Sequence, residues 1–426
     1  LNLSVMWSIM GFLSLGLNQD IVNTTKRLGY DQPTPVQLAA IPAIINQQDV
    51  MARAQTGTGK TAAFALPLVH NLCANSLDMP SACKPKLRTL VLTPTRELAQ
   101  QVFNSFKKYA KGSSLKTAIA YGGVSIKPQI ESLQHGADIL VATPGRLIDL
   151  MFKGSVEFSH LQSIVFDEAD RMLDMGFITD IKRILKRVPS SRQTLLFSAT
   201  FDDEIFKLSK TLLTDPVLIE VDSKNTAAVD IEQVVYNVDE DRKRELVSYL
   251  IGSKNWHQIL IFTRTKQGAD HLAKEMCKDG LKTLAIHGDK SQGAREKALQ
   301  EFKDGKIRAL VATDVAARGL DIETLEYVIN YELPFIAEDY IHRIGRTGRA
   351  GSSGLAISLL SVEENYLLEE VEAVLGERLS QQWFEGFEPD LSKPASNARK
   401  NSRSAQKRRH KDRAYGKDTG NRRRKS

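Results

Sequence analysis

Val50-Met-Ala-Arg-Ala-Gln-Thr-Gly-Thr-Gly-Lys-Thr61 runs from a short apolar segment through a glycine-containing loop into the apolar, helix-length stretch 62–72. A strand, a loop and a helix in this order form a phosphate cradle, because glycines let backbone N–H groups turn inward and the helix N-terminus adds positive charge. The strict motif has a glycine where this chain has Ala54, so the pattern is relaxed. A lysine at the end of the loop neutralises the β- and γ-phosphates, and the next hydroxyl ligates Mg²⁺. The candidate phosphate ligands are Gly57, Thr58, Gly59 and Lys60, and the candidate magnesium ligand is Thr61.

An acidic pair follows a second apolar run, in Ile164-Val-Phe-Asp-Glu-Ala-Asp170. This order places Asp167 and Glu168 at the C-terminal end of a predicted strand, the edge at which doubly wound sheets bind ligands. We assign Asp167 to Mg²⁺ and Glu168 to the attacking water, because the chemistry needs one carboxylate for each task. The alternative is an acidic first turn of a helix without a catalytic role.

The fold class follows from alternating patterns along the chain. Short β-branched and aliphatic runs alternate with amphipathic stretches of helix length from about residue 36 to 220, and the alternation restarts near residue 231. This pattern predicts the α/β class with two parallel sheets. The predicted strands are 50–52, 89–92, 117–120, 139–141, 163–166, 194–197 and 217–220, and then 233–238, 259–262, 283–286, 309–311, 327–330 and 356–359. The polar segment 221–230 suits a flexible linker between two separately cored domains, 10–220 and 231–385.

The positive charge is concentrated at the C-terminus. Residues 393–426 carry 14 of the 58 Lys and Arg residues but only 2 of the 51 Asp and Glu residues, so a body of net −5 carries a tail of net +12. Aliphatic residues nearly vanish after Phe387, and we expect 386–426 to be disordered because it cannot offset its ordering entropy. A basic arm attracts a polyanion, most commonly nucleic acid, and the alternative is a tail that only solubilises.

The cysteines and the first residues bear on the compartment. Cys73, Cys83 and Cys277 form no CxxC pair and no even framework, which argues against a zinc site and a disulfide-stapled secreted domain and favours reduced thiols in the cytoplasm. The hydrophobic stretch 1–17 lacks preceding basic residues and a cleavage site, so it supports neither export nor a membrane span. Because Met10 directly precedes the first segment that resembles a domain, our hypothesis is that 1–9 is an over-extended start.

Nine motifs occur in a fixed order along the chain. They are Gly29-Tyr-Asp-Gln-Pro-Thr-Pro-Val-Gln37, the loop 54–61, Pro94-Thr-Arg-Glu-Leu98, Thr143-Pro-Gly-Arg146, Asp167-Glu-Ala-Asp170, Ser198-Ala-Thr200, Phe262-Thr-Arg264, Ala312-Thr-Asp-Val-Ala-Ala-Arg-Gly-Leu-Asp321 and His342-Arg-Ile-Gly-Arg-Thr-Gly-Arg349. Over residues 12–360 the chain resembles the DEAD-box ATP-dependent RNA helicases. Within that family, 287–295, 331–339 and the basic tail resemble the bacterial RhlE branch. The resemblance implies two tandem RecA-like domains, the first of them binding ATP.

The resemblance also assigns residues to the nucleotide. In the family, the position of Gln37 reads the adenine edge, and a side-chain amide suits this because it donates and accepts at once. Phe12 matches the aromatic residue upstream of that motif, and Tyr30 stands where members usually carry Phe, so both are assigned to the adenine site. Asp321 is expected near the ribose. Arg346 and Arg349 are expected to reach the γ-phosphate as arginine fingers, and on a helix they would share a face.

Further residues are assigned to RNA and to coupling between the domains. The positions matching RNA contacts are Thr95, Arg96, Gly123, Thr143 and Arg146, then Arg264, Gly288 and Thr313. Small, hydroxyl and guanidinium groups suit phosphates and 2′-hydroxyls, which predicts binding independent of base sequence. The candidate coupling residues are Asp170, Ser198, Thr200 and His342, and we expect His342 near Asp170 or Gln193.

The predicted activity is RNA-stimulated ATP hydrolysis, with Mg²⁺ as cofactor, that drives domain closure and local unwinding of short duplexes. We expect a cytoplasmic monomer with no membrane contact, acting in ribosome assembly or RNA turnover on ribosomal precursors or with the RNA-decay machinery. A P-loop kinase or transport ATPase does not explain the second α/β half. An ATP-gated RNA clamp or a ribosome-associated scaffold with incidental unwinding remains the alternative.

Overall fold

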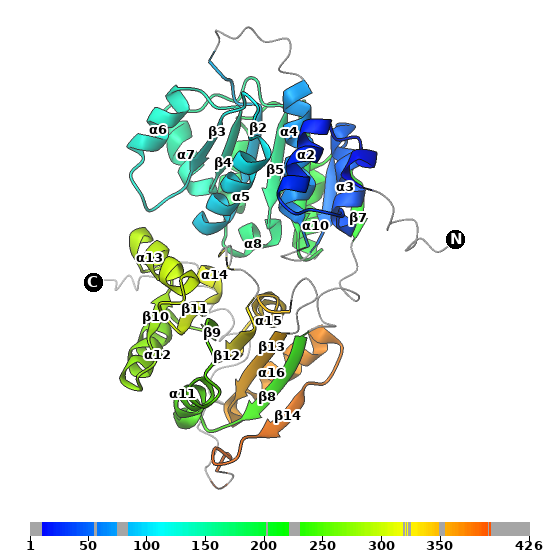
Figure 1. The fold of residues 1–426 in the computed structure, drawn as a ribbon. Coiled ribbons are helices and arrows are strands. Elements are labelled where there is room, and N and C mark those ends of the chain that lie inside the picture. The colour runs from blue at the N-terminus through cyan, green and yellow to red at the C-terminus, as the bar shows by residue number, and fades with distance from the viewer. Residues whose placement is uncertain are drawn as a thin grey trace, which may run out of the picture. The chain divides into compact units, whose positions relative to one another are not determined.

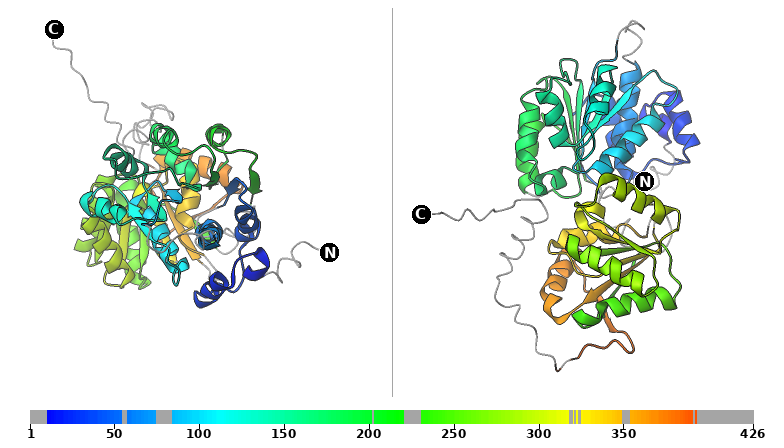
Figure 2. Two further views of the ribbon diagram at one scale, coloured as in Figure 1. Left: turned by 90° about the horizontal axis from the view of Figure 1, so that it is seen from above. Right: turned by 90° about the vertical axis from the view of Figure 1, so that its left-hand side faces the viewer.

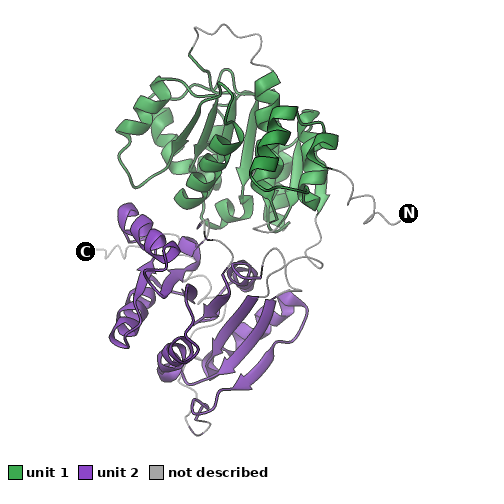
Figure 3. Cartoon of the chain, in the orientation of Figure 1, with its two compact units in different colours: residues 1–223 green, residues 224–426 purple. Residues whose placement is uncertain are grey.

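The computed structural model describes residues 11–54, 58–74, 84–201, 203–220, 231–317, 320, 322, 325–348, 354–390 and 392. The chain divides into two compact units, residues 1–223 and 224–426 (Figure 3). The hypothetical over-extended start 1–9, the predicted linker 221–230 and the basic part of the predicted tail, 393–426, lie outside the described residues. The tail was predicted to be disordered from residue 386, and this is wrong for 386–390, because Phe387 packs against a core cluster of the second unit and Arg242 lies over its ring. Within the described segments, no helix is both long enough and apolar enough to cross a membrane.

The first unit is built on a sheet of seven parallel strands in the order β3-β4-β2-β5-β6-β1-β7 (Figure 1). The strands are β1 Val50–Arg53, β2 Thr89–Leu92, β3 Thr117–Ala120, β4 Ile139–Ala142, β5 Ser163–Asp167, β6 Gln193–Ser198 and β7 Val217–Glu220. Each strand predicted in this half is confirmed to within one residue at either end. The apolar runs were sufficient here because central parallel strands are buried on both faces.

Helices cover both faces of this sheet (Figure 2). Val91, Val141 and Val165 point to one face and join a core with residues of α3, α4 and α5, whereas neighbouring residues such as Leu90 and Leu140 point to the other face and join a core with α7, α9 and α10. The helices are η1 Phe12–Leu15, α2 Gln19–Arg27, α3 Pro35–Ile45, α4 Lys60–Ala74, α5 Arg96–Tyr109, α6 Lys127–Gln134, α7 Pro144–Phe152, α8 Ala169–Asp174, α9 Ile178–Leu185 and α10 Asp203–Leu212.

The second unit repeats the architecture with parallel strands in the order β10-β11-β9-β12-β13-β8-β14. Its strands are β8 Ile231–Asn237, β9 Ile259–Thr263, β10 Thr283–Ile286, β11 Ala309–Thr313, β12 Tyr327–Asn330, β13 Gly354–Leu360 and β14 Ser380–Trp383. Its helices are η3 Glu240–Arg242, α11 Lys243–Ser253, α12 Lys266–Lys278, α13 Gln292–Lys303, α14 Asp314–Ala317, α15 Ala337–Ile344, η4 Val362–Glu364 and α16 Asn365–Leu375. The prediction of two parallel α/β sheets is therefore confirmed.

The sequence prediction missed β14. This strand lies at the edge of the sheet and pairs with β8 through the backbone. All four of its side chains are exposed, so Ser-Gln-Gln-Trp shows neither an apolar run nor an alternation that pattern analysis could detect.

Candidate nucleotide and RNA sites

The phosphate loop joins β1 to α4 in the first unit. Lys60 is the first residue of α4 and only 6% exposed, and its Nζ has no hydrogen-bond partner among the described residues. Thr58 and Gly59 precede it, whereas Gly57 lies outside the described residues. A buried ammonium group is costly without an anionic partner, so this position fits a bound phosphate.

Gln37 of α3 connects the predicted adenine site to this loop. Its Oε1 accepts a hydrogen bond from Thr34 N at 3.0 Å, and its Nε2 donates to Gly59 O at 3.1 Å. Gly59 has φ +90°, and a Cβ there would lie 2.4 Å from Gln37 Nε2, so the position requires glycine. The structure thus places the predicted adenine-reading amide against a predicted phosphate ligand.

The two aromatic residues assigned to adenine differ in their surroundings. Phe12 is buried in the core, and its segment η1 packs against α3, the helix of Gln37. Tyr30 is partly exposed, and its Oη lies 3.2 Å from Tyr109 Oη. The ring of Phe12 is therefore part of the packing that holds α3, and its contact with adenine stays a prediction.

The acidic pair lies where β5 ends. Asp167 is the last residue of β5 and 2% exposed, and its Oδ1 has no hydrogen-bond partner within the described part of the chain. Burial raises the pKa of Asp167 to about 7, against the opposing effect of nearby Lys60 and with a further increase from Glu168. Glu168 has φ +55°, a left-handed conformation that is uncommon for a residue with a side chain.

These residues fit a magnesium ion. Asp167 offers an unpartnered carboxylate oxygen and Thr61 a hydroxyl, both hard oxygen ligands of the kind that Mg²⁺ prefers. Among the described residues no cluster of three or more His, Cys, Asp or Glu could hold a metal alone. Mg²⁺ is commonly bound by one or two protein ligands together with substrate phosphates and water.

The predicted coupling residues of the first unit lie beside the acidic pair. Asp170 Oδ2 accepts a hydrogen bond from Ala199 N at 3.1 Å, which links the start of α8 to the segment after β6. Ser198, the last residue of β6, is fully buried, and its Oγ has no hydrogen-bond partner in the described part of the chain; Thr200 is half-buried. Gln193 is the first residue of the same strand and so lies at the N-terminal ends of the strands, where its Nε2 donates to Ile44 O and Gln48 O. Gln193 is thus separated from Asp170 by the length of β6.

The predicted RNA contacts of the first unit follow three neighbouring strands, β3, β4 and β2. Thr95 and Thr143 are the N-cap residues of α5 and α7, so both lie where a parallel strand has just ended. A Cβ on Gly123 would lie 2.1 to 2.5 Å from the guanidinium of Arg96, so these two residues touch. The structure therefore gathers these positions at one edge of the sheet.

Arg146 is held in place by groups that the sequence did not indicate. Its Nη1 donates to Gln129 Oε1 at 3.0 Å and its Nη2 donates to Val124 O at 2.9 Å. A shallow pocket lined by Val124, Ile126, Arg146, Asp149, Phe152 and Lys153 adjoins this side chain. Gln129 therefore orients Arg146 toward the edge that carries the other candidates.

The second unit carries its RNA candidates on the corresponding edge. Arg264 directly follows β9, Gly288 follows β10 by two residues, and Thr313 ends β11, which are again three neighbouring strands. A Cβ on Gly288 would lie 3.6 Å from Lys266 Cε, so the side chain of Lys266 covers this glycine.

The expected helical position of Arg346 is wrong, whereas its role as an arginine finger stays a prediction. A shared helix face for Arg346 and Arg349 was expected, but α15 ends at Ile344 because Gly345 caps it, and Arg346 lies in the turn that follows. Arg346 is buried, and His342 on α15 is half-buried. Arg349 and Asp321 lie outside the described residues.

Comparisons with known proteins agree with this geometry. The family model described as DEAD/DEAH box helicase matches residues 34–208, and the helicase conserved C-terminal domain matches residues 242–351. The chain is 41% identical to the ATP-dependent RNA helicase CshA of Listeria monocytogenes over 89% of this chain and 72% of that protein. It is 42% identical to the DEAD-box ATP-dependent RNA helicase RhpA of Helicobacter pylori over 82% and 69%.

The chain belongs to the family of DEAD-box ATP-dependent RNA helicases. Its structure is similar to that of the DEAD-box helicase Mss116 bound to single-stranded RNA and UDP-BeF, with a TM-score of 0.79 and 29% identity over 91% of this chain and 81% of that one. It is also similar to the structure of S. cerevisiae Dbp5 bound to RNA and ADP BeF3, with a TM-score of 0.77 and 28% identity over 87% of this chain and 95% of that one. The prediction of two RecA-like domains is confirmed.

The sequence analysis of this helicase missed Arg343, which stands inside the last motif. It is 1% exposed, and its Nε and Nη2 donate to the two carboxylate oxygens of Asp314 at 2.6 and 2.9 Å. Its Nη1 donates to Glu332 O at 2.6 Å, and the guanidinium lies 5.0 Å from the ring of Phe262. The motif gave no signal that this arginine is buried among partners from other parts of the second unit.

Proposed function

We propose that this helicase hydrolyses ATP when RNA is bound, and that ATP-driven closure of its two domains on the RNA backbone separates short duplexes locally. The observation that supports this most strongly is the buried pair of Lys60 and Asp167. Each has a polar atom without a hydrogen-bond partner among the described residues, and Lys60 acts on the pKa of Asp167. A cation site next to an anion site suits a magnesium triphosphate.

The roles within the nucleotide site follow from chemistry. Lys60 and the loop N–H groups bind the phosphates, Thr61 and Asp167 hold Mg²⁺, and Glu168 orients and deprotonates the attacking water. When bound, Mg²⁺ would neutralise negative charge on the nucleotide's phosphates. We propose Gln37 for adenine, with Phe12 and Tyr30 beside it, and Asp321 for the ribose. Arg346 and Arg349 would stabilise the negative charge of the transition state once the domains close.

We propose that RNA lies along the sheet edges that carry Thr95, Thr143 and Thr313. Hydroxyl groups, glycines and arginines contact phosphates and 2′-hydroxyls rather than base edges, so binding would not depend on base sequence. The basic tail 393–426 would add a second, salt-sensitive contact.

The finer assignments rest on the sequence. Residues 287–295 and 331–339 and the basic tail support the RhlE branch, and we propose a cytoplasmic monomer that acts on ribosomal precursors or with RNA-decay proteins.

One experiment tests the function. RNA-stimulated ATPase activity and unwinding of a short RNA duplex are measured in parallel for the wild-type chain and for Glu168→Gln. We expect the wild type to show both activities and the variant to show neither while still binding ATP and RNA. Hydrolysis without strand separation in the wild type would instead favour an ATP-gated clamp, and no hydrolysis in the presence of RNA would contradict the proposal.

A further inference from the structure

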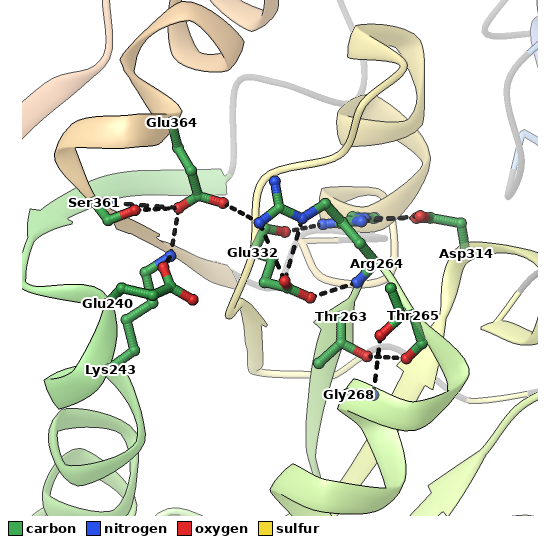
Figure 4. A network of polar contacts seen from close by, with 11 residues as sticks. Glu240, Lys243, Thr263, Arg264, Thr265, Gly268, Asp314, Glu332, Ser361 and Glu364 are labelled. Carbon is green, nitrogen blue, oxygen red and sulfur yellow. Dashed lines mark hydrogen bonds and ion pairs between the residues drawn. The ribbon is translucent and has the colours of Figure 1, made fainter. Parts of the chain in front are cut away.

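A chain of alternating charges runs through the second unit beside its RNA edge (Figure 4). Arg264 lies between Glu332 and Glu364, and Lys243 lies between Glu364 and Glu240. These residues come from the segment after β9, the segment after β12, η4, α11 and η3, so the network joins parts of the chain that are far apart in sequence. Of the five residues, only Arg264 belongs to a helicase motif named above.

Arg264 is held by two carboxylates. Its backbone N donates to Glu332 Oε2 at 2.7 Å, and its Nε and Nη2 donate to Glu332 Oε1 at 3.2 and 3.1 Å. Its Nη2 also lies 2.9 Å from Glu364 Oε1, and the guanidinium lies 4.8 Å from the ring of Phe335. The positive charge of this side chain is therefore already matched inside the protein.

The carboxylate of Glu364 also has partners other than Arg264. Lys243 is fully buried and pairs with Glu364, and it also lies 2.7 Å from the partly exposed Glu240. Ser361 donates to Glu364 Oε2 through Oγ at 3.2 Å. Burial tends to raise the pKa of Glu332, but the charge of Arg264, its hydrogen bonds and the charge of Lys243 together lower that pKa below its ordinary value, so Glu332 is ionised at neutral pH.

The loop that carries Arg264 is also shaped by hydroxyl groups. Thr263 Oγ1 donates to Thr265 O at 3.3 Å, and Thr265 Oγ1 accepts from Gly268 N at 2.9 Å, which caps α12. Fixing Arg264 at its backbone and at its guanidinium thus sets the course of 263–268 between β9 and α12.

We propose that Glu332, Glu364 and Lys243 are positioning residues for RNA binding, and that Arg264 serves RNA by fixing the 263–268 loop rather than by pairing with a phosphate. The inference rests on the proposed RNA-binding function and revises the contact that the family resemblance assigned to Arg264. A phosphate that captured this guanidinium would leave the half-buried Glu332 without its arginine partner and the buried Glu364 paired with Lys243 alone, which is costly.

Glu364→Gln distinguishes a loop-positioning role of Arg264 from a phosphate-binding role, because the two roles predict opposite changes in RNA affinity. The substitution leaves Arg264 paired with Glu332 and Lys243 paired with Glu240, so both cations keep a partner. If Arg264 positions the loop, loosening it weakens RNA binding by about fivefold, within the range for residues coupled to a site through contacts. If Arg264 pairs with phosphate, loss of the competing carboxylate strengthens binding.

The measurement is the fluorescence anisotropy of a labelled single-stranded RNA with the full chain and a non-hydrolysable ATP analogue, over a series of KCl concentrations. For Glu364→Gln and for Arg264→Gln we expect weaker binding with an unchanged slope of log affinity against log salt. A direct contact predicts that Arg264→Gln reduces the magnitude of the slope by about 0.7, the value for one phosphate on a single strand. Either that reduction or tighter binding by Glu364→Gln overturns the proposal.

Two controls complete the test. Glu245→Gln makes the same change in charge at an exposed position of α11 and should leave RNA affinity near that of the wild type. Should Glu364→Gln fold poorly, the double variant Lys243→Met with Glu364→Gln removes the buried pair without a net change in charge. We expect it to weaken RNA binding with an unchanged slope of log affinity against log salt. Wild-type affinity in that variant overturns the proposal. Failure of the wild type to bind RNA would contradict the proposed function itself.

Discussion

The two units contain the same type of sheet but differ in whether the buried polar groups at its functional edge have partners. At the functional edge of the first unit, Lys60 Nζ, Asp167 Oδ1 and Ser198 Oγ have no hydrogen-bond partner among the described residues. At the corresponding edge of the second unit, Arg264 and Arg343 are paired with carboxylates. Because unpaired buried groups cost stability, we infer a ligand-receiving role for the first edge and a shape-holding role for the paired arginines of the second.

The largest expected effect concerns Arg346 of the last motif. Arg346→Ala should reduce the rate of RNA-stimulated ATP hydrolysis by about 10³ to 10⁵, because arginine fingers act on the transition state, while ATP binding is largely kept. The rate and the nucleotide affinity are measured separately, with Arg346→Lys as the matched control. Loss of ATP binding together with the rate would place Arg346 in structure rather than catalysis.

Glu168→Gln tests the ligand-receiving edge of the first unit. Removing the base should slow hydrolysis by about 10² to 10⁴ while the amide still fits the site, so ATP and RNA remain bound. The dissociation of labelled RNA in the presence of ATP should then be slow, because the closed state cannot hydrolyse its nucleotide. Rapid RNA release from this variant would count against the role of Glu168.

Arg343→Met tests the shape-holding edge of the second unit. It leaves the largely buried carboxylate of Asp314 unpaired and should reduce the free energy of unfolding by about 3 to 5 kcal/mol, as measured by chemical denaturation. Arg244→Met breaks a more exposed pair with Asp279 and should cost no more than about 1 kcal/mol. Equal losses in the two variants would remove the contrast between buried and exposed pairing.

The smallest expected effect concerns pH and the first unit. His70 of α4 accepts a hydrogen bond from Asn18 N through Nδ1 at 3.1 Å, and burial lowers its pKa below the ordinary 6.5. His70 therefore takes up a proton more readily in the unfolded chain than in the folded one. The contribution of neutral His70 to the free energy of unfolding is complete above pH 6.5 and is lost as the pH falls below that value. The hydrogen bond is worth about 0.5 to 1.5 kcal/mol.

The variant His70→Asn keeps an acceptor but does not titrate. The difference in unfolding free energy between wild type and variant should therefore change between pH 7.5 and pH 5.5 in favour of the variant. A difference that does not change with pH would show that His70 does not contribute in this way.

Much of the fold was predictable from local patterns. Strands such as β2 and β9 are buried on both faces and leave unbroken apolar runs, whereas β14 is an exposed edge strand held by backbone hydrogen bonds and leaves no such signal. The turn at Gly345 also escaped, because a glycine within an amphipathic stretch is compatible with either a helix or its end.

The candidate site was predictable as a set of residue types but not as a set of partners. The motifs named Lys60 correctly as a charged residue at the start of a helix, and Asp167 and Arg264 as charged residues at strand ends. The partners of Arg264 could not be predicted, because Glu364 lies 100 positions further along the chain and belongs to no motif. The amide of Gln37 likewise reaches Gly59 only through the packing of α3 against α4.

We propose that ATP and RNA both favour one closed arrangement of the two units, so that binding of the two ligands is coupled. The most direct test uses Glu168→Gln and measures RNA affinity with and without ATP and ATP affinity with and without RNA. The account predicts that each ligand raises the affinity for the other, and by the same factor, because the coupling free energy is reciprocal. Affinities that do not respond to the other ligand would contradict it.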